Sequence, residues 1–249
     1  MNSEIESNSP ILSEYSPNDI LLQIELKVNI LDKKYRQQNS NQPCDEWRAF
    51  ISASNGLKVR FRAMVDADHI YTETVQTGNS TPENLYQQDN ALFTFFTNAV
   101  SVLEIACFLV FALASQLQPA TFPMNTKEAL RKINPKVVVK NFKLVYPKEY
   151  LTQTLETLIT DQQFQELKET RNILSHQGNP PRNYYTELNI IPGAPLQHKY
   201  IGGPKGEPPK WNGIVLDKNA IALRRQWVAK HIKAILEATL KFADNKIKP

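Results

Sequence analysis

The stretch Arg171-Asn172-Ile173-Leu174-Ser175-His176 places a permanent cation, an amide and a titratable imidazole within about one and a half helical turns. A guanidinium can hold a phosphate through two parallel hydrogen bonds, and an imidazole can exchange a proton near neutral pH. Residues five apart lie about 140° apart around a continuous helix, so Arg171 and His176 do not share one narrow face. Two arrangements would still bring them to one ligand. In the first, the helix would unwind at Ser175. In the second, two copies of the stretch would face each other across a dimer.

The surrounding residues predict that this stretch ends a helix. Three apolar residues mark one helical stripe: Phe164, Leu167 and Leu174. Arg171 falls on the same stripe, where a fourth apolar residue would be expected. Gly178 is the predicted C-cap and Pro180-Pro181 cannot continue a helix, which puts His176 in the last turn. The carbonyl groups at that end favour the protonated imidazole.

The Arg171, Asn172 and His176 pattern resembles the signature of the HEPN family, an Arg, usually followed by a small polar residue, and a His after four to six intervening residues. The resemblance implies an all-helical domain, often a metal-independent ribonuclease that dimerises so that two motifs line one cleft. Two other pairs satisfy the loose spacing: Arg62 with His69, and Arg225 with His231. Only the 171–176 stretch adds the Asn and a helix end.

Glu104 is the fourth candidate for the catalytic site. It is the one charge between Ala99 and Ala114, and a carboxylate with little water around it must be paired or protonated. Arg171 is its simplest predicted partner. Members of the HEPN family look similar here, with a Ser three residues before a Glu, as Ser101 and Glu104 stand. The alternative is a buried ion pair that only fixes helix register.

Composition indicates a soluble globular protein. The 249 residues are 41% hydrophobic and 22% charged, with a net charge of +4. Two cysteines form neither a disulfide framework nor a metal cluster, and the acidic N-terminus lacks the regions of a signal peptide. We therefore expect a cytoplasmic protein with no cofactor. The run from Ala99 to Ala114 is shorter than a membrane span, so we expect no membrane association and a central bundle helix.

Hydrophobic periodicity predicts an all-α fold, an antiparallel bundle of about five long helices. Residues 1–15 are polar and aperiodic, which predicts a flexible tail before one helical domain over 16–249. The predicted long helices span 16–36, 45–75, 83–117, 161–176 and 219–244. Asn55-Gly56 is a predicted bend. The last helix is expected to expose Arg224 and Arg225.

Shorter elements are expected between these helices. Residues 126–133 predict a short helix, Val137-Val138-Val139 suits a short strand, and Pro147 opens a helix to about 159. Asp68 lies on the apolar stripe of the second helix beside His69. Either a polar contact within the bundle or a partly exposed acid with a surface histidine fits that position.

The segment 178–216 predicts a loop-rich insertion, because it holds six of the eight glycines and seven of the sixteen prolines. Residues 188–191 and 213–216 are short apolar runs that would pair as a small β-hairpin. The aromatic residues of the insertion would either stack on bases or pack the loop onto the domain. Five residues here and in the preceding lysine-rich run are candidates for RNA binding: Lys136, Lys140, Lys143, Arg182 and Tyr184. A solvated lysine face is the alternative.

These features favour RNA cleavage of the kind that the HEPN resemblance implies, in a homodimer and without a metal. His176 would move the proton of a ribose 2′-hydroxyl or of the leaving oxygen. Arg171 would hold the phosphate, Asn172 would orient either group, and Glu104 would fix Arg171. The alternative is a non-catalytic HEPN-like protein that binds RNA or a nucleotide, or acts as a scaffold. The sequence does not identify the RNA, the trigger or an antitoxin-like protein partner.

Overall fold

The computed structural model describes residues 16–38, 44–76, 81–176, 184–187, 197–200, 210–211 and 214–248, and its class is all-α, as predicted. The predicted tail, 1–15, lies outside the described residues. Eight helices are described: α1 (Asn18–Gln38), α2 (Asp45–Gln76), α3 (Pro82–Leu117), α4 (Lys127–Lys132), α5 (Pro135–Val145), α6 (Tyr150–Thr160), α7 (Gln162–His176) and α8 (Lys218–Lys246). Four of them have 21 or more residues, whereas α7, the predicted fifth long helix, has 15.

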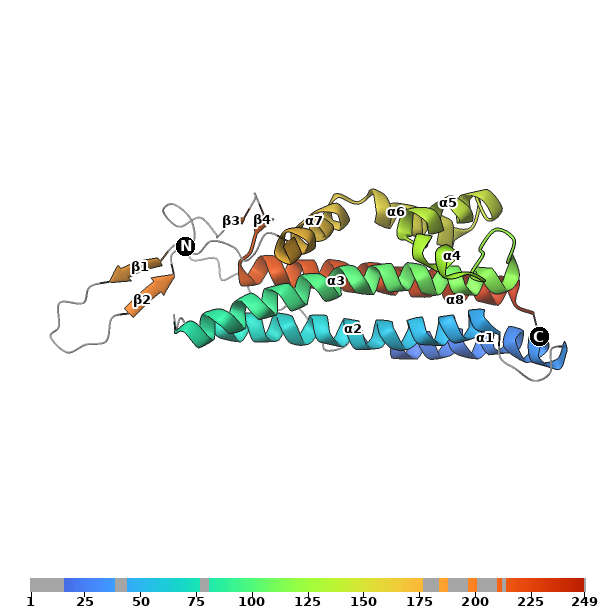
Figure 1. The fold of residues 1–249 in the computed structure, drawn as a ribbon, viewed down its shortest axis with the longest axis horizontal. Coiled ribbons are helices and arrows are strands. Elements are labelled where there is room, and N and C mark those ends of the chain that lie inside the picture. The colour runs from blue at the N-terminus through green and yellow to red at the C-terminus, as the bar shows by residue number, and fades with distance from the viewer. Residues whose placement is uncertain are drawn as a thin grey trace, which may run out of the picture.

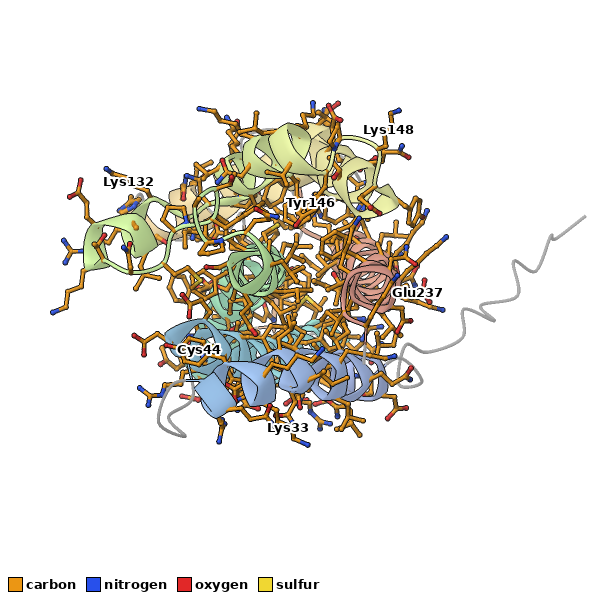
Figure 2. All side chains as sticks on the ribbon, turned by 90° about the vertical axis from the view of Figure 1, so that its right-hand side faces the viewer. Lys33, Cys44, Lys132, Tyr146, Lys148 and Glu237 are labelled. Carbon is orange, nitrogen blue, oxygen red and sulfur yellow. The ribbon has the colours of Figure 1, made fainter. Side chains whose placement is uncertain are left out.

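The helices form three layers (Figures 1 and 2). Helices α3 and α8 lie side by side in the middle, α1 and α2 cover one side, and α4 to α7 cover the other. One continuous apolar core runs through all three layers, from Leu21 and Phe50 through Phe96 to Leu167. The central pair is therefore covered on both sides, which suits the apolar composition of α3.

Helix α3 is the central helix that its composition predicted. Thr81 caps its first turn by accepting a hydrogen bond from the Asn84 amide, and Pro82 occupies the first turn, where a missing N–H has no cost. Helix α3 is the one described helix that is long and apolar enough to cross a membrane. Within its most apolar window, 67% of the residues are buried inside the protein. That burial is the pattern of a core helix.

Helix α5 replaces the short strand expected at Val137-Val138-Val139. The Asn134 side chain accepts a hydrogen bond from the Val137 amide at 3.1 Å, and Pro135 follows at the first helical position. Val138 and Val139 are buried, and Lys136 and Lys140 on the other face are exposed. The cap and the amphipathic pattern outweigh the strand preference of three valines, which is a weak local term.

The strand pairing within the insertion differs from the prediction. Strand β1 (Tyr184–Glu187) pairs antiparallel with β2 (Gln197–Tyr200), and β3 (Lys210–Trp211) pairs with β4 (Ile214–Val215). Residues 188–191, the predicted partner of 213–216, lie outside the described residues. The sequence between β3 and β4 is Asn212-Gly213, which is favoured in two-residue hairpin loops. A neighbour across such a short loop costs less entropy to pair than one about 25 residues away.

Candidate functional site

Helix α7 carries the candidate site at its C-terminal end. It packs on α3 through Phe164, Leu167 and Leu174, the three apolar residues that predicted its inner face. The fourth buried position belongs to Thr170, which is fully buried and donates its hydroxyl to the Glu166 carbonyl oxygen. The prediction that placed Arg171 on this stripe is therefore wrong by one residue, and Arg171 is half-exposed instead.

The guanidinium of Arg171 is tied to its neighbour. Its Nε donates to the Asn172 Oδ1 at 2.9 Å, and Asn172 is exposed. Asn172 and His176 are four residues apart, so they lie on the same face of the helix. The bond thus draws the arginine side chain toward the face that presents the imidazole. His176 is exposed and is the last residue of α7, which confirms its predicted place in the last turn.

Helix α7 does not unwind at Ser175. It continues to His176, and the Ser175 hydroxyl donates to the Arg171 carbonyl oxygen at 2.8 Å, four residues back. Of the two arrangements that would bring Arg171 and His176 to one ligand, the structure removes the unwound helix. The arrangement with two facing copies is left.

The three Arg and His pairs with the loose spacing have different surroundings. Arg62 donates to Asp66 at 2.8 Å on the surface of α2. Arg225 is buried in an ion pair with Asp68 at 3.0 Å. For Arg171, no carboxylate of the described residues lies within ion-pair distance. A guanidinium that already holds a carboxylate has fewer donors for a phosphate, so the 171–176 stretch is the best candidate of the three.

Glu104 does not pair with Arg171 within the described residues. It is half-buried on α3, so water reaches its carboxylate and the expected need for a partner does not arise. The negative charge of Glu166, in the middle of α7, opposes the burial that lowers the pKa of Arg224. The guanidinium of Arg224 lies over the Phe96 ring of α3. The middle of α7 is therefore level with Phe96. Glu104 is eight residues beyond Phe96, about 12 Å along α3. Figure 1 shows α7 running toward the start of α3, whereas Glu104 belongs to the second half of α3.

The candidate RNA-binding lysines do not join the site within one chain. Lys136, Lys140 and Lys143 are exposed on α5, and Lys143 forms an ion pair with Glu156 of α6. Figure 1 shows α5 at the opposite end of its layer from the end of α7. Tyr184 opens β1 opposite Tyr200, and Arg182 lies outside the described residues.

Two polar clusters connect α8 to other parts of the described bundle. In the first, the carboxylate of Asp68 on α2 pairs with Arg225 on α8, although Arg225 was expected to be exposed. Burial raises the pKa of Asp68 and the charge of Arg225 opposes that shift. The position of Asp68 on the apolar stripe was the signal for this pair, and the polar contact within the bundle is the alternative that holds. His69 is exposed.

In the second cluster, Asp161 between α6 and α7 holds two side chains of α8. It accepts a hydrogen bond from the Trp227 indole at 3.2 Å and lies 3.6 Å from His231 Nε2. Burial lowers the pKa of His231, and the negative charge of Asp161 opposes this. His231 also packs against the Trp227 ring. It is thus a half-buried packing residue, in contrast to His176.

Comparisons with models of protein families, with curated proteins and with solved structures found no match. The function is therefore inferred from the residues of this chain. Among the described residues, no group of three or more His, Cys, Asp or Glu side chains is arranged to hold a metal ion. The two cysteines are free and buried. At the end of α7, the half-exposed Arg171 and the exposed Asn172 and His176 combine a cation with an acid–base residue.

Proposed function

We propose that the protein is an endoribonuclease that resembles HEPN nucleases and cuts RNA by attack of a ribose 2′-hydroxyl. One observation supports this most. The Arg171 guanidinium is held by Asn172 on the face that presents His176, and no described carboxylate neutralises it. With a second copy of α7 facing it, a phosphate bound there would meet a cation and an imidazole together.

In the proposed reaction, the 2′-oxygen attacks the neighbouring phosphorus and the bond from phosphorus to the 5′-oxygen breaks. His176 takes the proton of the 2′-hydroxyl, or supplies the proton that the leaving 5′-oxygen needs. Arg171 binds the phosphate oxygens and stabilises the charge that grows on them. Asn172 orients Arg171 through the bond that its Oδ1 accepts. Because the nucleophile belongs to the substrate, no metal is required to generate it.

The proposal includes a homodimer. A single imidazole at one helix end cannot lie on both sides of the phosphorus, where the base and the acid act. A second copy of α7 would supply the other imidazole and a second guanidinium. Lys136, Lys140 and Lys143 are exposed on α5 and would contact RNA phosphates away from the cleaved linkage.

A single-turnover assay tests the proposal. Purified protein is mixed with end-labelled RNA in EDTA, and cleavage is compared for wild type, His176→Ala and His69→Ala. We expect His176→Ala to lose about 10² to 10⁴-fold in rate with RNA binding retained. His69→Ala is the matched control, because His69 is also exposed and satisfies the loose spacing with Arg62. It should cut at the wild-type rate.

The substrate provides a second control. RNA with a 2′-deoxyribose at the cleaved position should bind and stay intact, because it lacks the nucleophile. Cleavage that appears only with added magnesium, or cleavage of the deoxy substrate, would exclude this mechanism. RNA binding without cleavage by the wild type would instead favour the non-catalytic alternative.

A further inference from the structure

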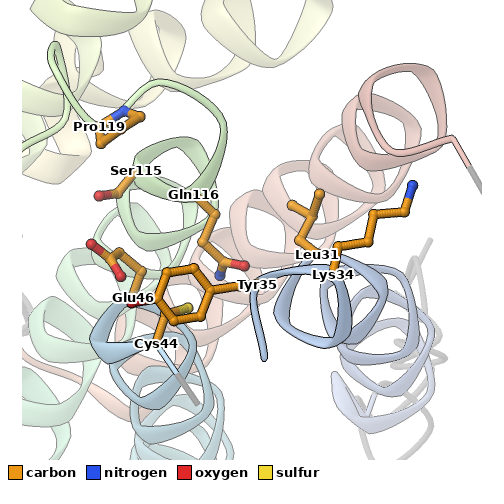
Figure 3. A pocket seen from close by; sticks show the side chains of 8 residues that line it. All are labelled: Leu31, Lys34, Tyr35, Cys44, Glu46, Ser115, Gln116 and Pro119. Atoms are coloured by element: carbon orange, nitrogen blue, oxygen red, sulfur yellow. The ribbon is translucent and has the colours of Figure 1, made fainter. Parts of the chain in front are cut away.

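A cavity of about 280 Å³ lies at the end of the bundle where α3 finishes, away from the end of α7. Figure 2 looks onto this end of the molecule, where Cys44 is labelled, and Figure 3 shows the cavity from close by. Ser115 and Gln116 line it from α3, Tyr35 from the end of α1, and Glu46 from the start of α2. None of these residues belongs to the proposed nuclease site.

Polar atoms behind the walls of the cavity lack hydrogen-bond partners. Ser115 is 1% exposed, and its hydroxyl oxygen is buried without a partner. Both terminal atoms of the Gln116 side chain, Oε1 and Nε2, are also buried without a partner. Buried polar groups in folded proteins are almost always hydrogen-bonded, and an unpaired one lowers stability. Three such atoms on adjacent residues therefore indicate that a polar ligand completes this site.

The charged groups around the cavity disfavour an anion. Lys34, a lining residue, donates its ammonium to the Lys248 carbonyl oxygen at 3.1 Å, and Figure 3 shows its side chain pointing away from Gln116. Arg36 is bound to the buried Asp32. The half-buried Glu46 adds an acceptor. Lys34 is the one cation among these lining residues and it points away from Gln116, whereas the Glu46 carboxylate favours N–H donors on a ligand.

The remaining walls suit a flat, uncharged ring. Leu31 and Pro119 give apolar surface, and the Gln116 side chain extends toward the ring of Tyr35 (Figure 3). Cys44 also lines the cavity, and burial raises the pKa of its thiol to about 11, so the thiol is neutral at physiological pH. The volume lies just below the range of sites for drug-sized ligands, which favours a molecule of one or two rings.

We propose that this cavity binds a small planar nitrogen heterocycle with an N–H donor beside a carbonyl or ring-nitrogen acceptor, the edge that lactams and nucleobases share. A carboxamide offers a donor and an acceptor side by side, so the Gln116 amide, once its side chain turns into the cavity, can form two parallel bonds with such an edge. The Ser115 hydroxyl would pair with a further N–H or carbonyl group, and the Glu46 carboxylate would accept from a further N–H. The inference does not depend on the nuclease proposal, because it uses other residues.

Calorimetric titration of the full chain with 2-pyridone and with 1-methyl-2-pyridone tests the proposal. The two rings differ in one methyl group, which removes the lactam N–H. We expect 2-pyridone to bind with a Kd on the order of 1 mM or tighter, as a small fragment can. The methylated ring should bind at least about tenfold more weakly, because it leaves the amide unpaired. Absence of binding, or equal binding of both rings, would overturn the proposal.

Variants locate the site. Gln116→Leu should weaken 2-pyridone binding by about tenfold or more, whereas Gln87→Leu, an exposed position on the same helix, should leave it unchanged. If Gln116→Leu does not fold, Ser115→Ala replaces it, since it removes only one oxygen. Undiminished binding by the folded variant would overturn the assignment to this cavity.

A panel of adenine, cytosine and uracil then separates nucleobases from simpler lactams. Binding of at least one base more tightly than 2-pyridone, with the same loss in Gln116→Leu, would assign the site to nucleobases. Weaker binding of all three bases would assign it to a single-ring lactam.

Discussion

At the scale of residues, two arginines show how position decides the role of one side chain. Arg171 is half-exposed and bound to an amide, so its charge is available to a ligand. The side chain of Arg225 is 10% exposed and forms an ion pair with Asp68, whose side chain is 3% exposed. Loss of either partner of such a buried pair leaves the other charged in an apolar interior.

This pair gives a prediction for stability. Arg225→Met should lower the free energy of unfolding by about 3 to 5 kcal/mol, because it leaves Asp68 buried without its partner. The double variant Asp68→Leu with Arg225→Met should regain most of that loss, because it removes both charges. Urea denaturation followed by circular dichroism measures both.

The control for this prediction is Lys132→Met in α4. Lys132 pairs with Glu128 at 2.7 Å, and both side chains are more than two-thirds exposed, at 71% and 79%. An exposed pair of this kind contributes less than about 1 kcal/mol, so the change should be small. A double variant no more stable than Arg225→Met would show that Asp68 is not the source of the loss.

At the scale of elements, α2 continues as one helix through Asn55-Gly56, the position of the predicted bend. A Cβ built on Gly56 would meet Ile105 Cδ1 of α3 at 3.7 Å, an ordinary van der Waals distance. The glycine is therefore not needed to let the two helices approach. Its effect is to make the unfolded chain more flexible and to weaken the helix.

Gly56→Ala should therefore raise the free energy of unfolding by about 0.5 to 1 kcal/mol. Thermal denaturation should show a higher Tm with unchanged helix content. Ala63→Gly, one of the half-buried positions further along α2, is the reverse control and should lower stability by a similar amount. A destabilised Gly56→Ala protein would mean that Ile105 cannot accommodate the added methyl group.

At the scale of the whole molecule, the three layers separate the two candidate sites. The Arg171 to His176 stretch ends α7 beside the first half of α3, whereas the cavity with Gln116 lies where α3 ends. A single chain presents one copy of the stretch on a continuous helix. The proposed nuclease therefore has to complete its site with a second chain.

Mixing two inactive variants tests whether two chains share each site. If each site combines Arg171 of one chain with His176 of the other, Arg171→Ala and His176→Ala proteins should regain activity when they exchange subunits. Random pairing makes half of the dimers mixed, with one intact site in two, which gives about a quarter of the wild-type rate. RNA cleavage measures the recovery, and each variant incubated alone is the control.

Analytical ultracentrifugation of the same samples separates the outcomes. A dimer that exchanges subunits without recovering activity would place both groups of a site on one chain. A monomer that cleaves RNA would contradict the proposed dimer altogether.

Local sequence predicted most of the helical segments and their approximate ends, with α5 as the exception. Ser16, Thr81, Thr126 and Asn134 each accept a hydrogen bond from the backbone at the start of a helix, and periodic apolar residues continue it. Caps and periodicity act within a few residues, so they are readable without knowledge of the fold. The same local signals placed His176 in the last turn of α7.

Tertiary structure alone decided which polar residues meet. The inner face of α7 takes Thr170 rather than Arg171, Glu104 stays apart from Arg171, and Arg225 reaches Asp68 across two helices. Residues next to each other on a helix are 100° apart, so a small rotation or shift between packed helices exchanges which of them is buried. That rotation depends on every side chain in the interface, and no short stretch of sequence contains it.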